Sequence, residues 1–306
     1  MKLLGLLRVF QGGATEAPGE GGPDLQGMLM HHLLDGHELE FEILGRGYTI
    51  DLTRYAIPPL HLGPLTIDLS PTRHIVFVLA AAVLLLLVFI PMGRAMRAKY
   101  EGRAPSGLAN ALEAMVLYFR DEVVRRNIGH GADAYTGYIL TLFFFILAMN
   151  LFGLVPFGST PTGNFMVTGA LALVTLVVVE ISGVQALGFK GYMRTIFYAP
   201  PGLHPVGQAI MLVILTPVEF LGKLTKPFAL MIRLFANMLA GHTLVLSLLG
   251  MIFMFAAIGP ARWGVAGASL VMVWGIMLLE VFVAFLQAYI FAMLTAVFIG
   301  LIRHAH

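Results

Sequence analysis

The sequence predicts an all-α integral membrane protein. Of its 306 residues, 58% are hydrophobic and 12% are charged, about half the charged fraction of roughly 25% that is typical of soluble domains. Several apolar runs reach the roughly 20 residues that a helix needs to cross a bilayer. The chain has no cysteine, which excludes disulfides, thiolate metal sites and a cysteine nucleophile.

The charges are nearly balanced, with 19 Lys and Arg against 17 Asp and Glu, for a net charge of +2. A nucleic-acid-binding protein needs a strongly basic face, so DNA and RNA are not expected partners. The informative residues are the few polar ones inside the apolar segments.

Residues 1–73 are expected to form an extramembrane N-terminal arm, because Gly and Pro interrupt the segment and an acidic run follows. Two interpretations of residues 1–17 stay open: a signal segment, or a surface helix because Arg8 interrupts the apolar run. Three histidines of the arm do not match a tight tetrahedral spacing, so we expect no metal site there. They are His31, His32 and His37.

The membrane domain is predicted to cover residues 74–306. Its first span is residues 75–92, about 27 Å of helix at 1.5 Å per residue. A basic cluster follows at once, which places this end in the cytoplasm and the arm outside. The cluster consists of Arg94, Arg97, Lys99 and Arg103. Residues 107–126 then show apolar residues at helical spacing and are predicted to form an amphipathic helix on the cytoplasmic membrane surface.

The second and third spans are predicted at residues 139–157 and 165–187. The loop between them has no Lys or Arg, as expected outside, and basic residues after the third span return the chain to the inside. Asn150 in the second span is interpreted as a polar contact between helices. For Glu180 in the third span, two roles stay open: lining an aqueous path or hydrogen-bonding a neighbouring helix.

Two further apolar segments are too long for simple spans. Residues 206–258 and 263–302 would be about 80 and 60 Å long as helices, against a hydrocarbon core of about 30 Å. Either each segment splits into two spans, or each lies tilted. Only the first segment has a natural place to split into two spans, at Lys223, Lys226 and Pro227. A tilt of about 60° exceeds the usual range, so the tilted alternative requires a partner surface.

Ionisable residues inside spans are functional candidates, because placing them there costs about 2.5–3.5 kcal/mol or more. Glu219, Lys226 and Arg233 recur every seven residues and Asn237 follows four later, so all four fall on one helix face. Prolines within the segment bend helices and change which residues share a face. Only the shared face of Arg233 and Asn237 is therefore a firm prediction. Lys226 has an alternative role, extending to the cytoplasmic interface.

The two long segments are predicted to form an antiparallel hairpin around Pro260. Residues whose numbers sum to about 520 then lie opposite each other, which pairs Arg233 with Gln287 and His242 with Glu280. An arginine cannot be deprotonated in a protein. Arg233 is therefore a permanent cation in an apolar segment, and an anionic group must visit it.

Two strings resemble the signature stretches of subunit a of F-type ATP synthase. They are MIRLFANMLAGH at residues 231–242 and EVFVAFLQAYIF at residues 280–291. The resemblance spans roughly residues 70–303. It implies one upright span, a surface helix, an upright helical hairpin and a long tilted helical hairpin lying against a ring of c subunits. It also implies b subunits of the peripheral stalk, the F1 head and lipid as partners, no cofactor, and a multi-pass protein of the bacterial plasma membrane with a cytoplasmic C-terminus.

The resemblance implies a proton-conducting stator subunit that is not catalytic by itself. Arg233 would face the ring carboxylates, with Asn237 and Gln287 as polar neighbours. His242 and Glu280 would relay protons on the outside. Glu219 would act on the cytoplasmic side, and the secondary candidates are Glu180, Lys226 and Asn150.

Two other functions are considered. A proton-coupled secondary transporter would also use membrane Arg, Glu and His, but it predicts repeat symmetry and a midplane pocket that the sequence does not reveal. An insertase or scaffold with a hydrophilic groove explains Arg233 but not the pair His242 and Glu280.

Overall fold

A computed structural model describes residues 36, 38–43, 46–55, 60–62, 65–67, 70–99, 107–155, 160–197, 204–255 and 260–304. The segment 1–17 and the histidines His31, His32 and His37 lie outside these residues. The chain divides into two compact units. The first unit contains residues 1–82, 148–164 and 235–284, and the second contains residues 83–147, 165–234 and 285–306.

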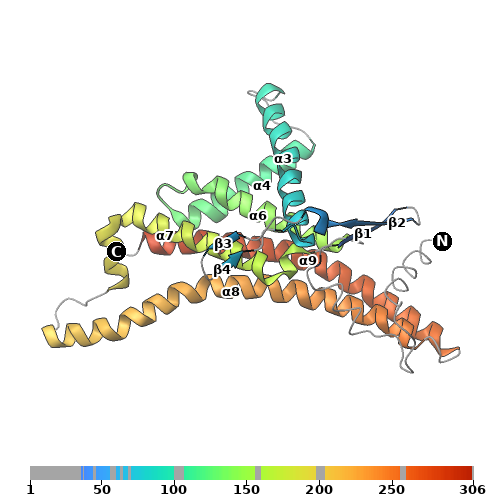
Figure 1. Ribbon diagram of the computed structural model, residues 1–306. Helices are drawn as coiled ribbons and strands as arrows, with labels where there is room; N and C mark the ends of the chain where they lie inside the picture. Colours follow the sequence, from blue (N-terminus) through green and yellow to red (C-terminus); the bar gives the residue numbers. More distant parts are fainter. Residues whose placement is uncertain are drawn as a thin grey trace. The chain divides into compact units, whose positions relative to one another are not determined.

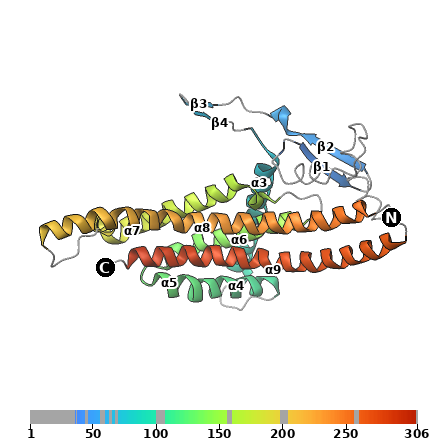
Figure 2. The ribbon, with the colours of Figure 1, turned by 90° about the horizontal axis from the view of Figure 1, so that it is seen from below.

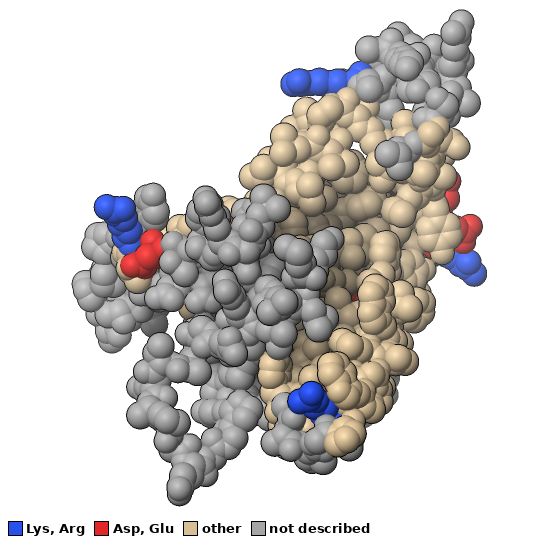
Figure 3. Space-filling view, turned by 90° about the vertical axis from the view of Figure 1, so that its right-hand side faces the viewer, with Lys and Arg blue, Asp and Glu red and all other residues tan. Residues whose placement is uncertain are grey.

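Five helices of the described chain are long and apolar enough to cross a membrane (Figure 1). This confirms the prediction of a helical membrane protein. The five are α3 (Arg73–Lys99), α6 (Asp133–Leu154), α7 (Phe165–Ile196), α8 (Pro205–Met254) and α9 (Ala261–Arg303). On the face shown in Figure 3, Lys, Arg, Asp and Glu appear only at a few separate places on the described surface. Apolar side chains left exposed in this way suit a lipid or protein environment.

The arm contains strands, which an all-α fold did not predict. β1 (Glu38–Ile43) pairs antiparallel with β2 (Arg46–Asp51), and β3 (Leu60–Leu62) pairs with β4 (Leu65–Ile67). A short 3₁₀ helix, η1, covers Leu52–Tyr55. The physical reason is visible in the β1 sequence ELEFEI, where acidic and apolar residues alternate with the period of a strand.

The predicted surface helix at residues 107–126 is formed in three segments. α4 (Leu108–Tyr118) continues into a π-helix, η2 (Phe119–Arg125), and a last turn, α5 (Arg126–Ile128). Its apolar side is buried within the second unit, where the ring centroid of Phe119 lies 4.5 Å from that of Phe143. Arg125 forms ion pairs with Asp121 and Asp133 at 2.9 and 3.1 Å, and the hydrogen bond to Asp133 raises the pKa of Arg125.

The helices α3, α6 and α7 differ from the predicted bounds at their ends. α3 continues past residue 92 into the basic cluster. α6 begins at Asp133, six residues before the predicted start, because polar residues continue the helix beyond its apolar run. α7 contains Gly188 with a φ of 68°, a left-handed conformation that favours glycine. The helix therefore kinks one residue after the predicted end at residue 187, and a second helical segment follows up to Ile196.

Both overlong segments form continuous helices of 50 and 43 residues, about 75 and 65 Å long. The alternative in which the first segment splits at Pro227 is therefore wrong, since Pro217 and Pro227 both lie inside α8. Within the first unit, the end of α8 and the beginning of α9 run side by side (Figures 1 and 2).

Candidate functional site

His242 and Glu280 meet in the first unit, as the hairpin register predicts. Nε2 of His242 lies 3.7 Å from Oε1 of Glu280. The Glu280 side chain is 5% exposed and that of His242 is 24% exposed. Both groups therefore lie largely inside the protein, on α8 and α9.

The carboxyl group of Glu280 is buried and underpaired. Neither of its oxygens has a hydrogen-bond partner among the described residues, and 3.7 Å is too long for a hydrogen bond to His242. A buried carboxylate that lacks hydrogen bonds is unfavourable. Because an imidazole can both accept and donate a proton, the pair has the chemistry to pass a proton between its members.

Gly241 leaves the space in which the Glu280 carboxyl group comes close to α8 and to His242. A Cβ atom on residue 241 would lie 2.7 Å from Oε1 and 3.0 Å from Cδ of Glu280. The sequence analysis did not single out Gly241. A glycine inside a helix lowers helix stability by about 1 kcal/mol relative to alanine. Its presence within a predicted helix is therefore a sequence signal for a packing role.

Two threonines of the loop before α7 make polar contacts around His242 and Asn150, and the first of them bonds the same imidazole nitrogen that faces Glu280. The hydroxyl group of Thr160 is hydrogen-bonded to Nε2 of His242. Thr160 immediately precedes the 3₁₀ turn η3 (Pro161–Gly163), and Thr162 in that turn donates a hydrogen bond of 2.7 Å to Oδ1 of Asn150. The sequence analysis missed both threonines because they lie in a loop, where apolar periodicity carries no signal.

Asn150 connects helices, as its interpretation as an interhelical contact predicts. Its Nδ2 donates a hydrogen bond of 3.2 Å to the carbonyl of Ala284 on α9. The side chain is completely buried. Its two partners account for its polarity without a role in proton transfer.

In the second unit, Arg233 is exposed and has no hydrogen bond or ion pair with a described residue. It lines a cavity of about 360 Å³ together with Lys226 of α8 and with Leu294 and Phe298 of α9. Gln287 is buried, and the described hydrogen bonds include none between it and Arg233. Their facing each other stays a prediction.

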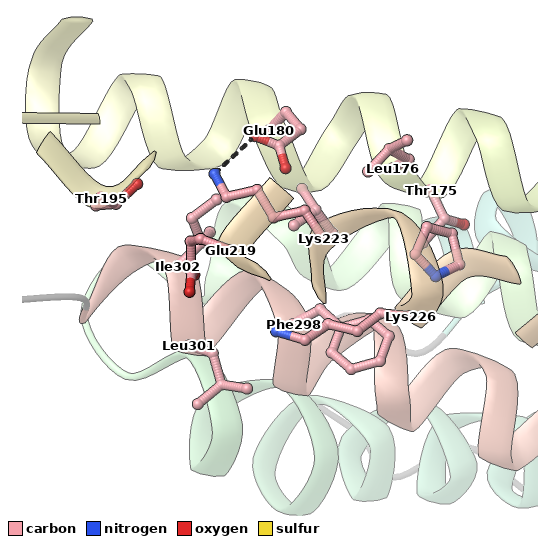
Figure 4. A pocket seen from close by; sticks show the side chains of 12 residues that line it. Thr175, Leu176, Glu180, Thr195, Glu219, Lys223, Lys226, Phe298, Leu301 and Ile302 are labelled. Atoms are coloured by element: carbon pink, nitrogen blue, oxygen red, sulfur yellow. Dashed lines mark hydrogen bonds and ion pairs between the residues drawn. The ribbon is translucent and has the colours of Figure 1, made fainter. Parts of the chain in front are cut away.

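A second cavity, of about 220 Å³, lies between α7, α8 and α9 of the same unit (Figure 4). It brings together three predicted residues, Glu180, Glu219 and Lys226. The Lys226 ammonium lies 5.7 Å from the ring centroid of Phe298, within reach of a cation–π contact. Glu180 contacts a neighbouring helix and lines this cavity, and its role in an aqueous path stays a prediction.

Lys223 is the partner of Glu180, with Nζ 3.4 Å from Oε2. In Figure 4 the two groups point toward each other from α8 and α7. Lys223 also donates to the hydroxyl of Tyr192 at 3.2 Å, and Tyr192 donates to Glu180. Lys223 therefore pairs with two groups of α7 inside the second unit. Asn237 is half-buried and belongs to the first unit.

Long apolar helices that hold ionisable residues define a multi-pass membrane protein, and such residues mark ion and proton pathways in this class. Residues 75–300 match the family described as ATP synthase A chain. The chain is 43% identical over 272 residues to ATP synthase subunit a of Chloroherpeton thalassium, covering 89% of this chain and 75% of that protein. It is also 42% identical over 283 residues to the subunit a of Chlorobium phaeobacteroides strain BS1, with 92% and 77% covered.

A third relative, ATP synthase subunit a of Anaeromyxobacter dehalogenans, is 44% identical over 300 residues, with 94% of this chain and 74% of that protein covered. The chain therefore belongs to the ATP synthase subunit a family. This confirms the resemblance carried by residues 231–242 and 280–291.

Proposed function

We propose that the chain is the proton-conducting stator subunit of a bacterial F-type ATP synthase. It offers two half-channels, offset around a ring of c subunits, that load and unload ring carboxylates and so couple proton flow to ring rotation. The observation that carries this proposal is the pair of half-buried His242 and buried Glu280, whose imidazole and carboxyl groups lie 3.7 Å apart. The chain itself is not the catalytic subunit.

The pair serves the outside half-channel. A ring carboxylate crosses lipid only when protonated, because a charged carboxylate is costly in an apolar medium. Protons must therefore be delivered from water through the membrane half that faces outside. Two titratable groups with no tight bond between them can accept and release such protons.

Arg233 separates the two half-channels. It is exposed and has no ion pair with a described residue, so its permanent charge is available to a carboxylate on a partner. It favours the ionised form of the passing ring carboxylate, and it opposes the passage of a proton directly from one half-channel to the other. Asn237 and Gln287 also interact with the ring carboxylate, which keeps its attraction to Arg233 weak enough for release.

The cytoplasmic half-channel uses Glu219, which lines the 220 Å³ cavity. Lys226 lines the same cavity and contributes positive charge to it. Each proton that moves through 100 mV supplies about 2.3 kcal/mol, which the ring transmits as torque.

The long helices supply the surface for the ring. At about 75 and 65 Å, α8 and α9 exceed the hydrocarbon core unless they tilt, and such a tilt is stabilised by a partner. Large exposed apolar side chains of α8, such as Val213, Phe220 and Phe228, suit that contact. The arm lies outside and the C-terminus in the cytoplasm, where the b subunits and the F1 head complete the complex.

Membership of the ATP synthase subunit a family supports the stator function over a proton-coupled secondary transporter. The decisive experiment is ATP-driven acidification of inside-out vesicles that carry the assembled complex. Arg233→Ala should abolish acidification while assembly continues. Arg233→Lys should also abolish acidification, because the titratable ammonium of lysine does not replace the delocalised guanidinium of arginine.

Arg262→Ala is the matched control. Arg262 is exposed at the beginning of α9, where it stacks on Trp263 at 5.2 Å, and its removal should leave pumping unchanged. Acidification at the wild-type rate by vesicles bearing Arg233→Ala would refute the proposed function.

A further inference from the structure

The second unit holds a half-buried ionic cluster that the mechanism above does not use. It consists of Glu180, Tyr192 and Lys223, joined by contacts of 3.4 Å between Lys223 and Glu180 and 3.2 Å between Lys223 and Tyr192. The side chains of Lys223 and Glu180 are only 15% and 25% exposed. Glu180 and Lys223 also line the cavity that contains Glu219.

Lys223 has two carboxylates within reach. Glu219 precedes it by four residues on α8, a spacing that places two side chains on the same helix face. Glu180 approaches from α7. Lys223 pairs with Glu180, and the described ion pairs include none between Glu219 and either lysine of the cavity.

Among the described residues that line the cavity, no acidic group other than Glu180 and Glu219 faces Lys223. Glu180 is the charged group from α7, while α8 contributes Glu219, Lys223 and Lys226. The α9 wall is apolar and consists of Phe298, Leu301 and Ile302. If Glu180 lost its charge, Glu219 would be the nearest carboxylate in this cavity for a buried ammonium.

We propose that Glu180 and Tyr192 are positioning residues that hold Lys223 away from Glu219, so that Glu219 stays free to exchange protons. An ammonium paired with Glu219 favours its charged form, and it must be displaced each time the carboxyl group takes up a proton. Removing the charge of Glu180 leaves the half-buried ammonium of Lys223 without its carboxylate partner, which favours a new ion pair between Lys223 and Glu219. This inference rests on the proposed role of Glu219 in proton transfer.

The test measures ATP-driven proton pumping per assembled complex, with the whole ATP synthase in lipid vesicles. Glu180→Gln should slow pumping about fivefold, the factor that corresponds to about 1 kcal/mol of new ion pairing at Glu219. Lys223→Met should pump like the wild type. The double variant Glu180→Gln with Lys223→Met should also recover the wild-type rate, because no ammonium is left to move.

Glu122→Gln is the matched control. It neutralises an exposed carboxylate that pairs with Arg126 at 3.2 Å, far along the chain from this cavity, and it should pump like the wild type. A wild-type complex that does not pump would refute the proposed function instead of this inference.

Two results would overturn the inference while the wild type pumps. The first is a wild-type rate in Glu180→Gln. The second is a double variant that stays slow, since Glu180 would then carry protons itself. If Glu180→Gln does not assemble, the double variant decides: pumping at the wild-type rate supports the inference, and slow pumping overturns it.

Discussion

The carboxyl group of Glu280 occupies the space that a side chain on residue 241 would fill. The nearest distance from a Cβ atom at Gly241 to Glu280 would be 2.7 Å, below any normal contact between these atoms. The residue next to His242 in the sequence thus controls how close the acid comes to the imidazole.

Gly241→Ala should therefore displace the Glu280 carboxyl group and slow proton pumping by about tenfold, because small misplacements of reacting groups have large effects on rate. Pumping per assembled complex is the measurement. Combining Gly241→Ala with Glu280→Asp, a shorter acid, should restore part of the rate. Gly275→Ala is the control, because a Cβ there meets nothing within 4 Å. Equal rates for Gly241→Ala and this control would show that the close approach has no role in function.

His242 and Glu280 should act as one unit. His242→Ala and Glu280→Ala should each slow proton conduction, and the double substitution should cost less than the sum of the two, by about 0.5–3 kcal/mol of coupling. The exchanged pair, His242→Glu with Glu280→His, should recover more activity than either single exchange. The measurement is a double-mutant cycle on the conduction rate. Additive losses without recovery in the exchanged pair would place the two residues on separate paths.

The topology is open to labelling, since the chain has no native cysteine. A cysteine at position 305 or between residues 224 and 227 should react with a membrane-impermeant reagent from the cytoplasmic side. A cysteine between residues 259 and 262 should react from the outside. The readout is labelling in intact cells against inside-out vesicles. Exclusive labelling of position 305 from the outside would contradict the proposed tilted hairpin.

The sequence alone determined the helical membrane class and one close contact in the site. Apolar runs of about 20 residues have few alternatives to a membrane helix. The rise per residue of a helix is constant, so two antiparallel helices joined by a turn pair residues of constant sum. This rule pairs His242 with Glu280 from the sequence alone. The alternation of acidic and apolar residues at 38–43 is also a local signal, typical of a strand.

Tertiary structure decided the contacts between elements that no short turn connects. Lys223 meets Glu180, which is 43 residues away, and Thr160 meets His242 across 82 residues. Periodicity specifies which face of a helix is polar, but it does not specify which other helix or loop packs on that face. That choice depends on side-chain shape and on small residues such as Gly241, so only the folded chain shows it.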